Sequence, residues 1–231
     1  MVDISLDQKY NHFTTPDFHP ERPLHHYAAP TINQKAVPVT SSPRVEVHGP
    51  RLGPMYVPKC PLVDCDFDLN SFCNFVTSNS NDTVSGRKNL REWMISARSV
   101  LNSLTGIPHD LAGGGSFLYA GGETVDPDEM FILSSEQEIQ FNQPAQLDFF
   151  VYQAGIRGTL KICIDDRSNC PLQLHGRDID STSQLWRNHH IDIEPGRHVI
   201  HFIAEGLHDN YVIGLDNIQL LNKFGTASLP C

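Results

Sequence analysis

The residues of this chain best suited to chemistry are its six cysteines, whose thiols can form disulfides, hold zinc or act as a redox pair. They are Cys60, Cys65, Cys73, Cys163, Cys170 and Cys231. Zinc ligands usually come in pairs with two to four residues between them. Here seven residues separate Cys65 from Cys73, and six separate Cys163 from Cys170. Neither spacing is the Cys-x-x-Cys of thioredoxin-type redox sites. Because the spacings fit neither a zinc site nor a redox pair, the even number of cysteines favours disulfides.

The pairing of these cysteines is open, because six cysteines allow fifteen connectivities. Proximity in the sequence favours Cys65 with Cys73, which would close a short loop. It also favours Cys163 with Cys170, because the ends of a hairpin can lie within the Cα distance that a disulfide needs. Cys60 would then pair with Cys231, joining the two ends of a domain and stabilising it by about 5 kcal/mol in the chain-entropy model.

The elements that hold these cysteines are predicted to be strands. From Cys65 onward, short β-prone runs alternate with turn signals such as 113-GGG-115 and 155-GIRG-158. In one run, Ile200 and Phe202 share a face while His201 points to the other. Eight runs at this spacing predict an all-β fold, a jelly-roll β-sandwich of two antiparallel sheets. The runs are 92–99, 116–122, 130–135, 145–153, 158–165, 184–193, 197–205 and 211–221.

The segment before Cys60 has a different composition. It holds nine of the sixteen prolines and five of the twelve histidines. Prolines this close together are incompatible with a helix or a central strand. We therefore expect residues 1–58 to be a disordered Pro-rich arm or linker, and residues 60–231 to form the domain.

The distribution of charge narrows the classes of partner. The net charge is −10, and residues 60–231 carry eleven Lys and Arg against twenty-two Asp and Glu. An acidic domain repels phosphate backbones, so neither nucleic acid nor an anionic membrane surface is an expected partner. No window approaches the ~20 apolar residues of a membrane span, so direct membrane insertion is not expected.

Motifs of the common hydrolases, metalloproteases and nucleotide-binding loops do not occur in the sequence. The adjacent His189 and His190 would point to opposite faces of a strand and therefore do not chelate one ion. No enzymatic activity is expected. Asn81, in 81-NDT-83, matches the acceptor pattern for N-glycosylation and fits a polar surface loop.

Five segments follow one another in a recognisable order. They are 65-CDFDLNSFCNF-75, 92-EWMI-95, 113-GGGSFLYAGG-122, 130-MFILSS-135 and 206-GLHDNYVIGLDNIQL-220. Together they resemble the successive motifs of MAM domains, the extracellular module named for meprin, neuropilin and a receptor tyrosine phosphatase. The resemblance covers about Cys60 to Cys231. It implies a jelly-roll sandwich on the extracellular side of the membrane, mediating adhesion or oligomerisation without catalysis.

The resemblance also implies a cation site, for Ca2+ or Na+, built from oxygen ligands. Asp66 or Asp68, Asp110 and Asp216 stand at the matching positions. Asp68 replaces a family Glu, and the segment around Asp110 departs from the family's Asp-His-Thr. The family's cysteine in the middle strand is Leu147 here, so its disulfide connectivity does not carry over whole.

We therefore expect an extracellular, non-catalytic protein-interaction module that binds other extracellular proteins or itself. Its interface would be the sheet face near Phe150 and Tyr152, or the loop 81–90. The alternatives are an accessory domain of a secreted or membrane enzyme and a carbohydrate-binding module, with glycans as partners. Trp93 and Trp186 could stack on sugars, although core positions are favoured for both.

The expected location outside the cell conflicts with the first residues, MVDISLDQKYNHF, which lack the apolar core of a signal peptide. A cytosolic protein would explain this feature, but not the disulfide pattern. We interpret the sequence as a fragment or as one with an incorrectly predicted start.

Overall fold

The computed structural model describes residues 60–79, 89–176 and 184–231. The predicted arm, residues 1–58, lies outside them, as does Asn81. The strands of the described residues are β1 (Phe75–Thr77), β2 (Leu90–Arg91), β3 (Met94–Ser96), β4 (Phe117–Gly122), β5 (Met130–Ser135), β6 (Ile139–Phe141), β7 (Ala145–Gln153), β8 (Thr159–Ile164), β9 (Leu172–His175), β10 (Arg187–Ile193), β11 (Gly196–His198), β12 (Ile200–Glu205) and β13 (Tyr211–Asn222).

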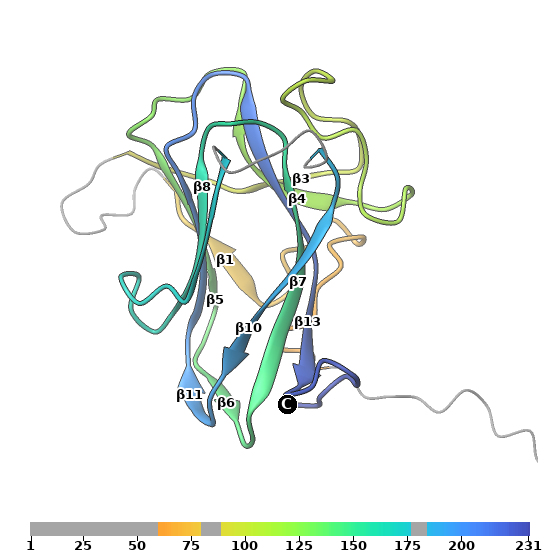
Figure 1. Ribbon diagram of the computed structural model, residues 1–231, viewed down its shortest axis with the longest axis vertical. Coiled ribbons are helices and arrows are strands. Elements are labelled where there is room, and N and C mark those ends of the chain that lie inside the picture. Colours follow the sequence, from red (N-terminus) through yellow and green to blue (C-terminus); the bar gives the residue numbers. More distant parts are fainter. Residues whose placement is uncertain (1–59, 80–88, 177–183) are drawn as a thin grey trace, which may run out of the picture. The chain divides into compact units, whose positions relative to one another are not determined.

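Two sheets form a sandwich, which confirms the predicted fold class (Figure 1). One sheet has the order β1-β5-β12-β8-β9, with β2 beside β5, and the other has the order β10-β7-β13-β4-β3. The long strands alternate between the sheets along the chain, as a jelly roll requires. All pairings within the two sheets are antiparallel except that of β2 with β5, and β6 pairs with β11 in a small separate ribbon.

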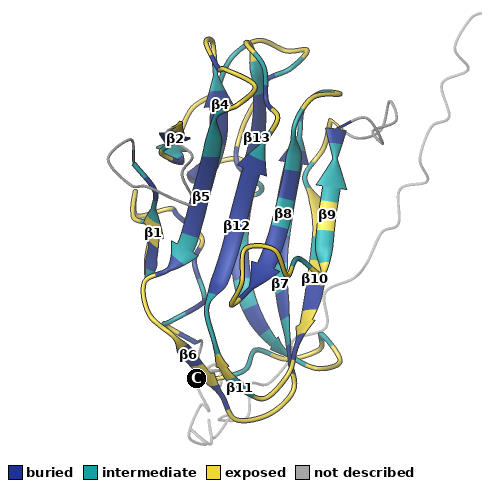
Figure 2. Cartoon of the chain, turned by 90° about the vertical axis from the view of Figure 1, so that its left-hand side faces the viewer, coloured by how far each residue is buried: buried dark blue, intermediate teal, exposed yellow. Residues whose placement is uncertain are grey.

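The core lies between the two sheets because alternate residues of each strand point inward. Phe202 of β12 packs edge-on against Phe149 of β7 at 5.3 Å and against Phe75 of β1 at 6.1 Å between ring centroids. The central strands are buried along most of their length, and β9 and β10 at the sheet edges are more exposed (Figure 2). Phe67, from the loop between Cys65 and Cys73, is also buried in this core.

Each sheet also carries a smaller apolar cluster on its outer face. On the five-stranded sheet, Ile107, Phe117 and Tyr152 pack together with the half-buried Trp186. On the other sheet, Ile132, Cys163 and Ile203 form a second cluster with neighbouring residues. These outer clusters explain why β5 and β12 are buried on both faces and do not show the half-polar alternation of a solvent-facing sheet.

Several predicted strands need correction. The run 184–193 becomes a strand only from Arg187, and the run 197–205 divides at Val199 into β11 and β12. The two halves have different partners, because β11 pairs with β6 whereas β12 lies between β5 and β8. The short strands β1, β2, β6 and β9 were not among the predicted runs. Among the described residues, no helix is long and apolar enough to cross a membrane.

Three disulfides are present: Cys60–Cys231, Cys65–Cys73 and Cys163–Cys170. The last two join cysteines that are close in the sequence, and the first joins the remaining pair, as expected. The first bond links residues 171 positions apart, with Cα atoms 4.8 Å from each other. It therefore brings the first described residue next to the last residue of the sequence.

Candidate functional site

The candidate site lies where the loop between Cys65 and Cys73 meets β13. At this place the pairing of β13 with β7 is irregular. The register between β13 and β7 shifts between Asp216 and Gln219, and Asn217 has a φ of 50°. This β-bulge releases Ile218 from β7, and Ile218 instead exchanges two backbone hydrogen bonds with Cys65. The bulge therefore determines where the disulfide-closed loop attaches to the sheet.

Asp216 is buried at this bulge, with 4% of its surface exposed. Its Oδ2 accepts a hydrogen bond from the Leu111 N–H at 2.9 Å, and its Oδ1 accepts one from the Asn217 N–H at 2.7 Å. Burial, together with the negative charges of Asp110 and Asp68, raises the pKa of Asp216 to about 6, against the two hydrogen bonds, which lower it. Of the predicted ligands, Asp216 therefore lies beside Asp110, whose neighbour Leu111 is its donor, and the charge of Asp68 also acts on Asp216.

The carboxylates of Asp110 and Asp68 accept hydrogen bonds from backbone N–H groups. Asp110 is also buried, and its Oδ2 accepts from the N–H groups of Ala112 and Gly113, both at 3.0 Å. Asp68 is exposed, and its Oδ1 accepts from the Ser116 N–H at 2.8 Å. A Cβ atom on Gly115 would lie 1.8 Å from that same Oδ1, so only glycine allows the carboxylate to approach here.

Asp66, the fourth predicted ligand, is exposed, and its Oδ1 accepts only a long 3.3 Å hydrogen bond from the Asp68 N–H. A cation needs several oxygens converging on one point. In residues 60–79, 89–176 and 184–231, no group of three or more His, Cys, Asp or Glu side chains is arranged to hold a metal ion. The Ca2+ or Na+ site implied by the resemblance stays a prediction.

Asp64 is the residue of this region that the sequence did not identify. Its Oδ2 accepts from the Cys60 N–H at 2.9 Å, and its Oδ1 accepts from the Leu220 N–H at 2.8 Å. One carboxylate therefore fastens the opening turn to the last strand. An Asp four residues after a cysteine gives no signal of this role, because the partner at Leu220 is 156 positions away.

The two tryptophans do not form a sugar-stacking platform. Trp93 is 1% exposed, which confirms its expected place in the core. Trp186 is half-buried, packs edge-on against Phe117 and Tyr152, and donates its indole N–H to the His109 carbonyl at 2.9 Å. Because Tyr152 is itself buried, it is not part of an exposed interaction face as expected.

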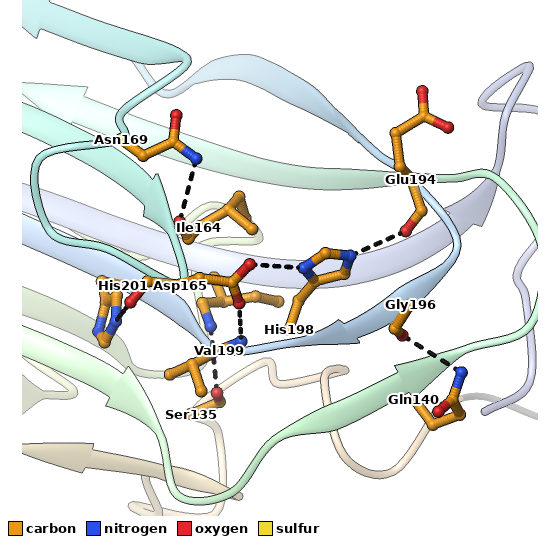
Figure 3. Close-up of polar contacts among 11 residues, drawn as sticks. Ser135, Gln140, Ile164, Asp165, Asn169, Glu194, Gly196, His198, Val199 and His201 are labelled. Atoms are coloured by element: carbon orange, nitrogen blue, oxygen red, sulfur yellow. Dashed lines mark hydrogen bonds and ion pairs between the residues drawn. The ribbon is translucent and has the colours of Figure 1, made fainter.

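A second polar network surrounds Asp165, at the turn after β8 (Figure 3). Asp165 Oδ2 lies 2.8 Å from His198 Nδ1, and its Oδ1 accepts from the Val199 N–H at 3.0 Å. The other ring nitrogen of His198 lies 3.2 Å from the Glu194 carbonyl oxygen. Both neighbours of this ring are acceptors, so only doubly protonated His198 donates to both. The network joins the disulfide hairpin of Cys163 to the turn before β11.

Exposed apolar side chains gather at the loop end where β7 runs into β8. Leu104, Ile156 and Leu185 are 73%, 60% and 64% exposed. Their three loops adjoin: Gln184 Nε2 donates to the Leu104 carbonyl at 2.8 Å, and a Cβ on Gly155 would lie 3.5 Å from a methyl carbon of Thr105. We name these three side chains the loop-end surface. The loop 81–90, the other expected interface, lies outside the described residues up to residue 88.

Known proteins similar to this chain include one family and several solved structures. A family model described as "MAM domain, meprin/A5/mu" matches residues 65–226. No curated protein sequence matches the chain. Similar solved structures include the K1 cleaved adhesin domain of Lys-gingipain from Porphyromonas gingivalis W83, at 14% identity and a TM-score of 0.48, with 69% of this chain and 97% of that chain covered. TmCBM61 in complex with β-1,4-galactotriose matches at 15% identity and a TM-score of 0.45, with 68% and 94% covered. Similarity at this level says nothing about function.

Proposed function

The chain belongs to the MAM domain family, and on this premise we propose that it is a non-catalytic protein-interaction module of the extracellular space, acting in adhesion or oligomerisation. Three disulfides support the location, because such bonds persist outside the reducing cytosol. The carboxylates at the bulge support a structural role, because their hydrogen bonds are to backbone N–H groups of neighbouring loops.

The loop-end surface is the observation that carries this proposal. Single exposed aliphatic residues are common on protein surfaces. Leu104, Ile156 and Leu185, however, come from three adjoining loops and are each more than half exposed. Apolar side chains gathered in this way are typical of protein–protein contact sites. We propose that this surface contacts a second copy of the chain.

Aggregation of beads coated with the full chain tests the proposal. Wild-type beads should aggregate, and the double variant Leu104→Asp/Leu185→Asp should not, because two carboxylates would be buried in the contact. Phe224→Asp is the matched control. Phe224 is 72% exposed but follows the end of β13, at the opposite end of the sandwich from the β7–β8 turn.

Salt provides an independent readout. Two copies of an acidic chain repel each other, and salt screens that repulsion while leaving apolar contacts in place. Aggregation of wild-type beads should therefore increase from low salt to 0.5 M NaCl. Absence of aggregation at both salt concentrations, or equal aggregation by all three proteins, would contradict self-association through this surface.

A further inference from the structure

A hollow of about 580 Å³ opens beside β3 and β4, on the outer face of the five-stranded sheet. This volume lies within the ~300–1,000 Å³ typical of small-molecule sites. Met94 of β3 and Tyr119 of β4 are register partners, so their side chains share this face. The hollow is separate from the bulge at Asp216 and from the three side chains of the loop-end surface.

One arginine in the hollow is held in place. Arg91 Nη1 donates to the Thr124 carbonyl at 2.6 Å and to Glu129 Oε2 at 3.0 Å. Its guanidinium carbon also lies 5.6 Å from the centroid of the Phe131 ring, in cation–π geometry. A guanidinium fixed on three sides loses little side-chain entropy when it binds a further group.

A second arginine lines the same hollow and has no partner for its guanidinium among the residues that the structure describes. Arg98 is exposed, and its backbone is fixed by Ser96, whose Oγ accepts from the Arg98 N–H at 3.1 Å and donates to the Arg98 carbonyl at 2.8 Å. Residues 60–231 hold twice as many acidic as basic side chains. Two arginines at one hollow are therefore a local excess of positive charge in an acidic domain.

The rest of the wall is uncharged apart from one carboxylate. Tyr119 and Met94 offer a ring and a thioether, and Ser96 and Ser99 offer hydroxyl groups. The Tyr119 hydroxyl donates to Met94 Sδ at 3.5 Å, and burial raises the pKa of this phenol. Glu123 also lines the hollow. Its negative charge disfavours ligands with many anionic groups, such as a polyphosphate.

We propose that this hollow binds an acidic sugar, that is, a saccharide ring carrying one carboxylate. Arg98 is the group that pairs with the carboxylate, in the bidentate geometry that guanidinium groups favour. Tyr119 packs against the ring, and the Ser99 hydroxyl binds one of its hydroxyl groups, because the Ser96 hydroxyl already donates to the Arg98 carbonyl. The carboxylate distinguishes this ligand from a neutral sugar, and the ring distinguishes it from an acidic peptide.

Saturation-transfer NMR titrations of the full chain test this proposal with four probes. 3′-Sialyllactose and a glucuronate-terminated disaccharide represent the two sources of a sugar carboxylate, lactose is the neutral comparison, and a short Glu-rich peptide is the competing class. At least one acidic sugar should bind, with a Kd in the range of about 1 mM, and lactose and the peptide should not. Comparison of the titrations with the two acidic sugars identifies which of them is preferred.

Arg98→Gln should weaken binding of the acidic sugar about tenfold or more, the loss expected for a charge-assisted hydrogen bond. Arg157→Gln is the matched control, since Arg157 is an exposed arginine outside the hollow, and binding should not change. Binding of neither acidic sugar, equal binding of lactose, equal binding by Arg98→Gln, or binding of the peptide alone would overturn the proposal. None of these results alters the bead experiment, because that experiment uses neither variant and depends on Leu104 and Leu185.

Discussion

At the scale of single residues, Asp216 shows how a backbone irregularity makes a carboxylate part of the fold. The bulge places its side chain where two backbone N–H groups bind it, one from Leu111 and one from Asn217. Burial and two neighbouring carboxylates oppose its ionisation and raise its pKa from 3.8 to about 6. Ionised Asp216 is therefore more costly in the folded protein than in the unfolded chain.

The sign of this linkage gives a prediction. Between pH 3.8 and about 6, the folded protein binds more protons at Asp216 than the unfolded chain does, so stability contributed by this group falls as pH rises. In EDTA-containing buffer the effect should reach about 2–3 kcal/mol. Urea unfolding from pH 4 to pH 7 should show a steeper decrease for wild type than for Asp216→Asn. Parallel pH profiles for the two proteins would show that the Asp216 pKa is not raised.

The acidic residues of the opening loop show what the sequence could not settle at this scale. Asp66 and Asp68 were candidates by resemblance, yet Asp64 makes the contacts that fasten the loop. Phe67 and Cys73 have positive φ angles, so the alternation of a strand does not apply to this loop. Which carboxylate turns inward depends on those angles, and the sequence contains no periodic signal for them.

At the scale of elements, strands with two well-formed neighbours were predicted best. The runs 130–135 and 145–153 coincide with β5 and β7 to the residue. Short strands were missed because β6 and β9 have three and four residues, too few for a pattern, and exist through pairing with one partner each. The predicted start at 184 was wrong because Trp186 leaves the sheet to cover its outer face.

Close packing between Trp186 and β13 leads to a prediction at this scale. A Cβ atom on Gly214 would lie 2.7 Å from Ile107 Cδ1 and 2.8 Å from Trp186 Cη2. Gly214→Ala should therefore push the outer cluster off the sheet and cost about 1–3 kcal/mol, as overpacking does. Urea unfolding followed by tryptophan fluorescence measures the loss. Gly114→Ala is the control, because a Cβ there meets nothing within 4 Å, and equal effects of the two changes would contradict the packing argument.

At the scale of the whole domain, the three disulfides should differ in how much they stabilise the fold. The Cys60–Cys231 bond spans 171 positions and the Cys163–Cys170 bond spans only seven. Loop-closure entropy gives about 5 kcal/mol for the long loop and about 2.5 kcal/mol for the short one. Paired alanine replacements of each bond, compared by thermal unfolding, should rank in this order. A larger loss from the short bond would show that packing around Cys163, not chain entropy, dominates.

The same long-range bond has a mechanical consequence. Its two Cα atoms are 4.8 Å apart, so a pulling force applied at Cys60 and Cys231 crosses a covalent link without loading the hydrogen bonds between strands. The 171 positions enclosed by the link, less those closed off by the two inner disulfides, would otherwise extend to roughly 500 Å. With the Cys60–Cys231 bond intact, the domain does not lengthen under a force applied at these two residues. Reduction of this one bond therefore allows the domain to unfold and extend under the same force.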